Sequence, residues 1–282
     1  MRQPHKSDSF KIPASLPTLR RIGSKIIHHA LVDSTNGSAF EAAAAGAPDG
    51  TVIIADAQRS GRGRQGRRWE SPTGCNLYLS ILLRGPFPQP VLIGLPFLAA
   101  VAARDAVESV TGLSPQLKWP NDLMMNDRKA GGILVEARSA GGDTNLAVVG
   151  IGLNVNWPSC AIPDGLKTTA TSLQIELGRT CDRSDLFAEV LTRFDRGYDR
   201  LYHEGAGWLL DEWSRHCQTL GRRVAVETPS GRYTGQAEAV EPGGRLRLRR
   251  DDGSIHCLSV EATITLRPDE HPATGAAHAL RH

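Results

Sequence analysis

The strongest constraint on the fold is a change in the character of the chain near Leu220-Gly221. Beyond this point, short runs rich in Val, Leu, Ile and Thr alternate with turn sequences such as Pro229-Ser230-Gly231 and Asp251-Asp252-Gly253. Short apolar runs between turn signals are typical of antiparallel strands, which can close into a small barrel. We therefore predict five short strands between residues 222 and 267, within an all-β barrel that spans residues 219–268.

The longer part of the chain, residues 25–218, mixes strand and helix patterns. Apolar β-prone runs predict strands over residues 25–33, 51–55, 76–83 and, in several short pieces, 116–156. Helical spacing of apolar residues covers residues 91–110, 184–203 and 207–216, and a further helix is predicted to begin at Ser34-Thr35-Asn36. This part is therefore predicted to contain both strands and helices, unlike the all-β unit that follows it.

The two ends of the chain lack periodic patterns. We predict a partly disordered leader over residues 1–24, with at most one short helix over residues 16–24, and a disordered tail over residues 269–282. No apolar run follows the charged residues at the start, which argues against a secretory signal.

The composition excludes several classes of protein. A formal charge of +3 gives no general argument for binding to nucleic acid or to a membrane surface. The most apolar stretch, residues 91–110, includes Pro96, Arg104 and Asp105 and lacks the roughly 20 apolar residues of a membrane helix. Five cysteines without a CxxC pair fit reduced thiols better than disulfides or a zinc site, so we expect a cytoplasmic protein.

The densest chemical signal is an arginine-rich loop at residues 58–69, with the sequence QRSGRGRQGRRW. Its glycines allow the backbone to approach a ligand closely, and its guanidinium groups offer forks of donors to carboxylate or phosphate oxygens. Taken alone, the loop is equally consistent with a nucleotide site and with a solvated basic loop or RNA contact. Trp69 is its only aromatic residue, which weakens the RNA alternative.

Gly61, Gly63 and Gly66 also spell the dinucleotide-binding pattern GxGxxG. That pattern requires a helix that opens inside it and an acidic residue about 20 positions later. Here arginines fill the spaces and Ser71-Pro72-Thr73-Gly74 blocks a helix, so we reject a Rossmann site.

A second block combines Lys118-Trp119-Pro120-Asn121-Asp122 with Lys129, which opens the following strand. An amide and a carboxylate at a strand end can hold a metal-bound phosphate, and Mg²⁺ suits one carboxylate together with waters. Each of these residues alone also fits a surface turn with a solvated lysine. A third block, Gly150-Ile151-Gly152-Leu153-Asn154, places two glycines in an apolar strand, either for close approach of a ligand or for a bulge.

Together these blocks resemble those of the biotin–protein ligases. The similarity includes Asp33 to Asn36, the arginine loop, the KWPND block, residues 128–136, Gly150 to Asn154 and Ala170-Thr171-Ser172-Leu173, in the order typical of that family. It extends over residues 26–267. The resemblance implies an α+β fold in which a central mixed β-sheet carries helices packed on one face and is followed by a small SH3-like barrel.

The resemblance also implies roles for individual residues. Biotin would contact Ser34, Thr35, Asn36, Gln58, Gly61, Arg62, Arg64, Lys129, Gly131, Gly150 and Gly152. ATP and the adenylate would contact Arg64, Arg67, Arg68, Trp69, Asn121, Asp122, Lys129, Asn154 and Arg267, with Mg²⁺ on Asp122. Lys129 and Arg64 would be catalytic, because positive groups stabilise the charge that develops as biotin attacks ATP. The product, biotinyl-5'-adenylate, would then biotinylate a lysine of a carboxylase carrier domain.

The implied partners are therefore biotin, ATP and the carrier domain, without a membrane, for a monomer or a homodimer. No room for three helices of about 11 residues precedes Asp33, so we expect no DNA-reading domain. Two alternatives remain: a lipoyl-type enzyme for another carboxylic acid, and an RNA-binding protein that uses the loop and the barrel. His28-His29 points to opposite strand faces and is not expected to bind metal. The arginine-rich residues 245–250 are expected to form a solvated face rather than a carrier-docking surface.

Overall fold

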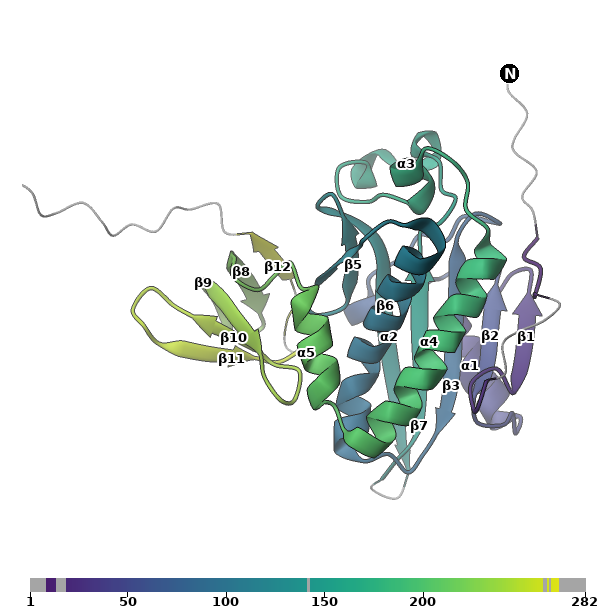
Figure 1. The fold of residues 1–282 in the computed structure, drawn as a ribbon, viewed down its shortest axis with the longest axis horizontal. Coiled ribbons are helices and arrows are strands. Elements are labelled where there is room, and N and C mark those ends of the chain that lie inside the picture. The colour runs from purple at the N-terminus through teal and green to yellow at the C-terminus, as the bar shows by residue number, and fades with distance from the viewer. Residues whose placement is uncertain (1–8, 14–18, 141–142, 261–262, 264, 269–282) are drawn as a thin grey trace, which may run out of the picture.

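The computed structural model describes residues 9–13, 19–140, 143–260, 263 and 265–268. The predicted disorder of the leader and of the tail falls largely on residues 1–8, 14–18 and 269–282, which lie outside the described residues. Two sheets organise the molecule, one larger and covered by helices and one smaller at the C-terminal end (Figure 1).

The larger sheet has seven strands in the order β1-β2-β3-β7-β6-β5-β4. β1 pairs parallel to β2 and every other pair is antiparallel, so the predicted mixed sheet is confirmed. Its strands are β1 (Lys25–His29), β2 (Thr51–Ala55), β3 (Leu77–Arg84), β4 (Gln116–Lys118), β5 (Asp122–Met125), β6 (Arg128–Ala140) and β7 (Asp143–Leu153).

Three helices form a layer on one face of this sheet: α2 (Gln89–Thr111), α4 (Arg183–Glu204) and α5 (Gly207–Arg215). α2 ends where predicted, because Gly112 adopts a left-handed conformation (φ 76°). By length and composition α2 passes as a membrane span, but 72% of its most apolar window is buried inside the protein. It is therefore the core helix of a globular fold, onto which α4 packs.

The prediction that the helices pack on one face has one exception. α1 (Thr35–Ala44) covers the opposite face, where Phe40 meets Ile53, Leu82 and Val148. Their sequence neighbours in the strands, such as Val52 and Val149, belong to the core under α2 and α4. Successive strand residues face opposite sides, so this sheet is buried on both faces over part of its area. The short α3 (Leu173–Leu177) follows β7.

The C-terminal unit is an antiparallel sheet of five strands in the order β11-β10-β9-β8-β12, as predicted. The strands are β8 (Arg223–Thr228), β9 (Gly231–Val240), β10 (Leu246–Arg249), β11 (Ile255–Leu258) and β12 (Thr265–Pro268). The indole of the buried Trp119 donates to the Gly244 carbonyl oxygen at 3.0 Å, which ties this unit to the turn between β4 and β5. The exact domain boundaries near residue 219 stay a prediction.

The arginine-rich segment of the C-terminal unit is neutralised by carboxylates. Arg247 and Arg249 both pair with Glu238, while Arg245 pairs with Glu241 and Arg250 with Asp252. These pairs fit the expected solvated face and leave little surplus charge for docking an anion.

The described part of the leader packs on the larger sheet. Where a short helix was predicted, residues 19–24 form turns, because the carboxylate of Asp195 accepts the backbone N–H groups of Arg20, Arg21 and Ile22 at 2.8–2.9 Å. Asp56 similarly accepts the Phe10 N–H and pairs with His28 at 3.1 Å. His28 is thus a structural residue, as expected.

We predict that Asp195→Asn lowers the free energy of unfolding by about 2 kcal/mol, because an amide N–H would face backbone N–H groups inside the protein. Asp195 is 3% exposed. The matched control is Asp199→Asn, which removes a surface ion pair with Arg20 and should cost about 0.5 kcal/mol. Urea denaturation of both variants checks this, and equal losses would contradict a buried anchoring role.

Candidate functional site

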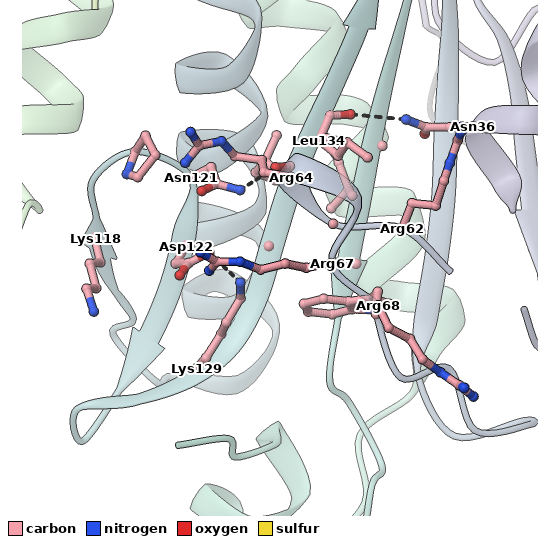
Figure 2. Close-up of a pocket in the computed structure, with 18 of the residues that line it drawn as sticks. Asn36, Arg62, Arg64, Arg67, Arg68, Lys118, Asn121, Asp122, Lys129 and Leu134 are labelled. Carbon is pink, nitrogen blue, oxygen red and sulfur yellow. Dashed lines mark hydrogen bonds and ion pairs between the residues drawn. The ribbon is translucent and has the colours of Figure 1, made fainter. Parts of the chain in front are cut away.

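One cavity of about 680 Å³ opens on the face of the larger sheet that carries α1 (Figure 2). The strand register aligns five lining residues in a row across β4, β5, β6, β7 and β3: Lys118, Asp122, Gly132, Gly152 and Tyr78. A second row contains Leu134, Gly150 and Ser80. Cross-strand neighbours share a face of the sheet, so these rows form the floor of the cavity.

Glycines occupy the floor positions that the side chains of Asn36, Trp69 and Lys129 approach closely. A Cβ on Gly150 would lie 2.4 Å from Asn36 Oδ1, and a Cβ on Gly152 would lie 2.8 Å from Trp69 Cε2. Gly132 is similarly close to Trp69 and to Lys129, at 3.2 Å each. The glycines of β7 permit the close approach of Asn36 and Trp69, and the register is regular at both positions, so neither marks a bulge. Close approach of a ligand to them stays a prediction.

The start of α1 forms the end of the cavity whose hydrogen-bonding groups are mostly uncharged, called here the uncharged end. Ser34 is its N-cap residue but makes no capping bond with its side chain. Instead the Gln58 amide oxygen accepts the Thr35 N–H at 2.9 Å, and the Gln58 amide nitrogen donates to Ser71 at 2.9 Å. Ser80 donates toward Asn36 Oδ1 at 2.6 Å. Amides and hydroxyls here offer both donors and acceptors to a neutral polar ligand.

Glu136 organises this end, although it was not predicted to be a site residue. Its carboxylate accepts from Asn36 Nδ2 at 2.7 Å and pairs with the Arg62 guanidinium at 3.0 Å. Residues of β6 alternate between the two faces of the sheet, and Glu136 is on the same face as the site. This alternation could have identified Glu136 as a site residue from the sequence.

The arginine-rich loop folds back on itself beside the floor. The Gly63 N–H donates to the Arg67 carbonyl oxygen at 2.7 Å around a short 3₁₀ turn, Arg64–Gly66. No α-helix opens in this segment, whereas the dinucleotide-binding pattern requires one. Arg64 Nη2 donates to the carbonyl oxygens of Val260 and Thr263, the latter at 3.0 Å, so the loop contacts the C-terminal unit.

The loop ends with the indole of Trp69 on the glycine floor. Lys129 Nζ lies 5.3 Å from the Trp69 ring centroid, a cation–π contact. Trp69 Nε1 has no hydrogen-bond partner among the described residues. In Figure 2, Arg68 points away from the other labelled side chains.

Cations dominate the other end of the cavity. Lys129 Nζ pairs with Asp122 Oδ1 at 2.5 Å, and Asn121 Nδ2 donates to the Ile133 carbonyl oxygen at 2.7 Å (Figure 2). Lys118 lines the same end, where burial is the main cause that lowers the pKa of its amine. A neutral end joined to a cationic end fits a ligand that is itself neutral at one end and anionic at the other.

Most predicted site residues line this cavity: Ser34, Thr35, Asn36, Gln58, Arg62, Arg64, Arg67, Arg68, Trp69, Asn121, Asp122, Lys129, Gly150, Gly152 and Arg267. Arg267 is far from the arginine loop in the sequence but reaches the site because β12 forms one wall. Lining residues that were not predicted to contact a ligand include Lys118, Tyr78, Gly132 and Thr169.

Three residues that were predicted to contact a ligand do not line the cavity, and their contact with a ligand stays a prediction. Asn154 is 3% exposed and donates to the Thr171 carbonyl oxygen at 2.9 Å, so it fastens the segment after β7. Gly131 lies on the opposite side of β6, where a Cβ would stand 2.7 Å from the Leu153 side chain. Gly61 packs against the Trp69 backbone and shapes the loop from within.

The described residues contain no cluster of metal ligands, and the two thiols that line a second cavity are not activated. Groups of three or more His, Cys, Asp or Glu that could hold a metal are absent from the described part of the chain. Cys75 and Cys181 line a separate cavity of about 730 Å³, and burial raises both pKa values, that of Cys75 to about 11. These thiols stay protonated at neutral pH and are poor nucleophiles.

Comparisons with known proteins agree with this geometry. The chain matches the Biotin/lipoate A/B protein ligase family over residues 29–154 and the Biotin protein ligase C terminal domain over residues 219–261. It is 32% identical to the bifunctional ligase/repressor BirA of Bacillus subtilis, over 93% of this chain and 81% of that protein. It is 31% identical to the biotin–[acetyl-CoA-carboxylase] ligase of Paracoccus denitrificans, over 79% and 94% respectively.

The fold agrees with solved structures as well. The biotin protein ligase from Aquifex aeolicus in complex with biotin and ATP superposes with a TM-score of 0.76 at 29% identity. The alignment covers 87% of this chain and 100% of that one.

We predict that Gly150→Ala lowers the free energy of unfolding by roughly 2 kcal/mol, because the new methyl group would overlap Asn36. The matched control is Gly207→Ala, at the start of α5, where no atom lies within 4 Å. That variant should stay within about 0.5 kcal/mol of the parent protein. Denaturation curves of the two variants measure both losses, and a similar loss for the two would contradict steric overlap between residue 150 and Asn36.

Proposed function

The chain belongs to the biotin protein ligase family, and from this we propose that it activates biotin with ATP and transfers it to a lysine of a carboxylase carrier domain. The observation that carries the proposal is the glycine-floored cavity with an uncharged end at α1 and a cationic end at β4, β5 and β12. Biotin combines a neutral ureido ring with a carboxylate, and ATP adds a polyanion at the carboxylate end.

The uncharged end suits the biotin ring. Ser34, Thr35, Asn36 and Gln58 supply donors and acceptors for a ureido group, and Gly150 lets the Asn36 side chain lie close to β7. Arg62, held by Glu136, borders the same region. The biotin carboxylate would then point along the row of floor residues toward Lys129.

The cationic end suits the phosphates of ATP. Arg64 and Arg67 lie in the loop above the floor, and Arg267 approaches from β12. Arg68 borders the same cavity but points away from these side chains. Asp122 is the one carboxylate among the described residues that line the cavity. Mg²⁺ is commonly held by one or two carboxylates together with phosphates and waters, so Asp122 is the residue that would hold Mg²⁺, and the ion would offset the charge of the phosphates.

The reaction needs no covalent nucleophile from the protein. A biotin carboxylate oxygen attacks the α-phosphorus of ATP, the bond to the bridging oxygen breaks, and pyrophosphate leaves. Lys129 sits beside Trp69 and Asp122, where its ammonium stabilises the growing negative charge, and Arg64 adds a second cation. The neutral amine of the carrier lysine then attacks the biotinyl carbonyl carbon, loses a proton and displaces AMP.

Two other interpretations predict different behaviour. A lipoyl-type enzyme would prefer an aliphatic acid, yet polar groups rather than an aliphatic tunnel surround the α1 end. An RNA-binding protein would require unpaired arginines on the barrel, whereas those of β10 have carboxylate partners. A cytoplasmic location, the absence of DNA binding and the oligomeric state stay predictions.

The proposal is tested by measuring pyrophosphate release with biotin, lipoate or octanoate in the presence of ATP and Mg²⁺. We expect release with biotin alone among the three acids, and labelling of a purified biotin carboxyl carrier domain on its acceptor lysine. Turnover with lipoate or octanoate in place of biotin would leave the fold assignment intact but contradict the assignment of biotin as the substrate.

We further predict that Arg64→Gly still forms biotinyl-5'-adenylate but releases it at least about tenfold faster, since charged hydrogen bonds to Val260 and Thr263 are lost. Labelling of an unrelated lysine-rich protein in the same tube measures the release. Arg59→Gly is the matched control, because Arg59 lies in the same loop but pairs with Asp33 and does not line the cavity. Release from Arg64→Gly at the parent rate would contradict a closing role for this side chain.

A further inference from the structure

The β6 strand contains one extra residue beside Lys129, and this residue determines the side of the sheet that Lys129 faces. The register pairs Asp122 with Gly132. It then pairs Met124 with Lys129, so Ala130 of β6 has no partner of its own in β5. Lys129 and Gly132 are three positions apart and would face opposite sides of a regular strand. Both line the cavity, because the bulge at Ala130 turns Lys129 toward it.

At this bulge, the backbone of Lys129 bonds to a short segment that precedes α3. The Lys129 N–H donates to the Thr169 carbonyl oxygen at 2.7 Å, and the Thr171 N–H donates to the Lys129 carbonyl oxygen at 2.9 Å. The Asn154 N–H donates to the neighbouring Ala130 carbonyl oxygen at 2.8 Å. The segment before α3 therefore takes the place of a strand beside Lys129 and fixes the point from which its side chain extends.

The carboxylate of Glu176, in α3, joins this segment to the turn on the other side of Lys129. Glu176 Oε1 accepts from the Thr171 hydroxyl and from Arg128 Nη2, the latter at 2.8 Å. Glu176 Oε2 accepts from Asn126 Nδ2 at 2.6 Å. The Glu176 side chain is 8% exposed, so its carboxylate is largely removed from water, where hydrogen bonds are electrostatically stronger.

The turn that Glu176 holds leads directly into Lys129. It consists of Asn126 and Asp127, both in the left-handed conformation (φ 48° and 59°), and Arg128 follows as the first residue of β6. Two-residue turns of this kind set the register of the strands that they connect. Glu176 does not line the cavity, so any effect that it has on a ligand passes through the residues that it fixes.

We propose that Glu176 is a positioning residue for the adenylation step: it fixes the Lys129 backbone from both flanks, so that the ammonium lies where the biotin carboxylate meets the α-phosphate. The assignment rests on the proposed function for the role of Lys129. A displacement of about 1 Å at such a group can slow a reaction on the order of 100-fold. Because the ammonium stabilises charge that develops in the transition state, the loss falls on kcat rather than on KM.

The test compares Glu176→Gln with the parent protein in biotin-dependent exchange of pyrophosphate into ATP. We expect kcat to fall about tenfold or more, while the KM values for biotin and ATP stay within about twofold. In a Lys129→Met background the same substitution should cause almost no further loss, since the two residues act as a unit. The matched control is Glu189→Gln, which removes a carboxylate partner of Arg193 on α4, outside the cavity, and should match the parent protein.

Thr171 offers a second pair of variants that leaves the Glu176 carboxylate in place. Thr171 is fully buried. Thr171→Val removes the hydroxyl donor with little change in volume and should lower kcat about threefold or more, as expected for one lost hydrogen bond. Thr171→Ser keeps the donor and should retain most of the parent rate. This pair carries the comparison if thermal unfolding shows that Glu176→Gln does not fold.

Three results would overturn the assignment: an unchanged kcat, a raised KM at unchanged kcat, or an equal loss from Glu176→Gln with and without Lys129. Failure of the proposed function has a separate signature, since the parent protein itself would then show no biotin-dependent exchange. Amide hydrogen exchange over residues 126–132 separates the two failures, because it needs no substrate. Faster exchange there in Glu176→Gln than in Glu189→Gln is expected if Glu176 holds this backbone.

Discussion

The structure depends on the close approach of other groups to one bare stretch of sheet. Gly132, Gly150 and Gly152 lie on the same face of β6 and β7, with Asn36 and the Trp69 indole directly over them. At these glycines the side chains of Asn36 and Trp69 lie directly against the strand backbone, on the floor of the cavity. Glycine inside strands weakens them, and here the antiparallel partners on both sides hold β6 and β7 in place.

The walls of the cavity come from distant parts of the chain that are fastened by a few polar contacts. Glu136 joins β6 to α1 and to the arginine loop through Asn36 and Arg62. Trp119 joins the turn between β4 and β5 to the C-terminal unit, and β12 then brings Arg267 to the cationic end. The C-terminal unit is therefore a structural part of the site, because it supplies both a wall and a positive charge.

Much of the fold could be predicted from local patterns. The five C-terminal strands, the helix that Gly112 ends, and strand β2 agree closely with the predictions made from the sequence, since turn residues and apolar spacing act over a few residues. The prediction failed where a distant group overrides local preference. Residues 19–24 form turns because the Asp195 carboxylate, over 170 positions away, collects their N–H groups. The position of α1 on the opposite face from α2 was also not predicted, because the helical spacing of apolar residues does not specify which face of a sheet a helix covers.

The sequence alone determined the order of the elements, the all-β C-terminal unit and the blocks rich in arginine, glycine and polar residues that mark a nucleotide- and acid-binding site. Those features depend on backbone preferences and side-chain chemistry within short segments. Only the tertiary structure decided which residues face the cavity. It moved Asn154 and Gly131 out of the cavity, and it aligned Lys118 with Asp122, Gly132 and Gly152 in one row. The physical reason is that strand register sets the facing side of every residue in a sheet, and register is fixed by hydrogen bonds between strands that lie far apart in the chain.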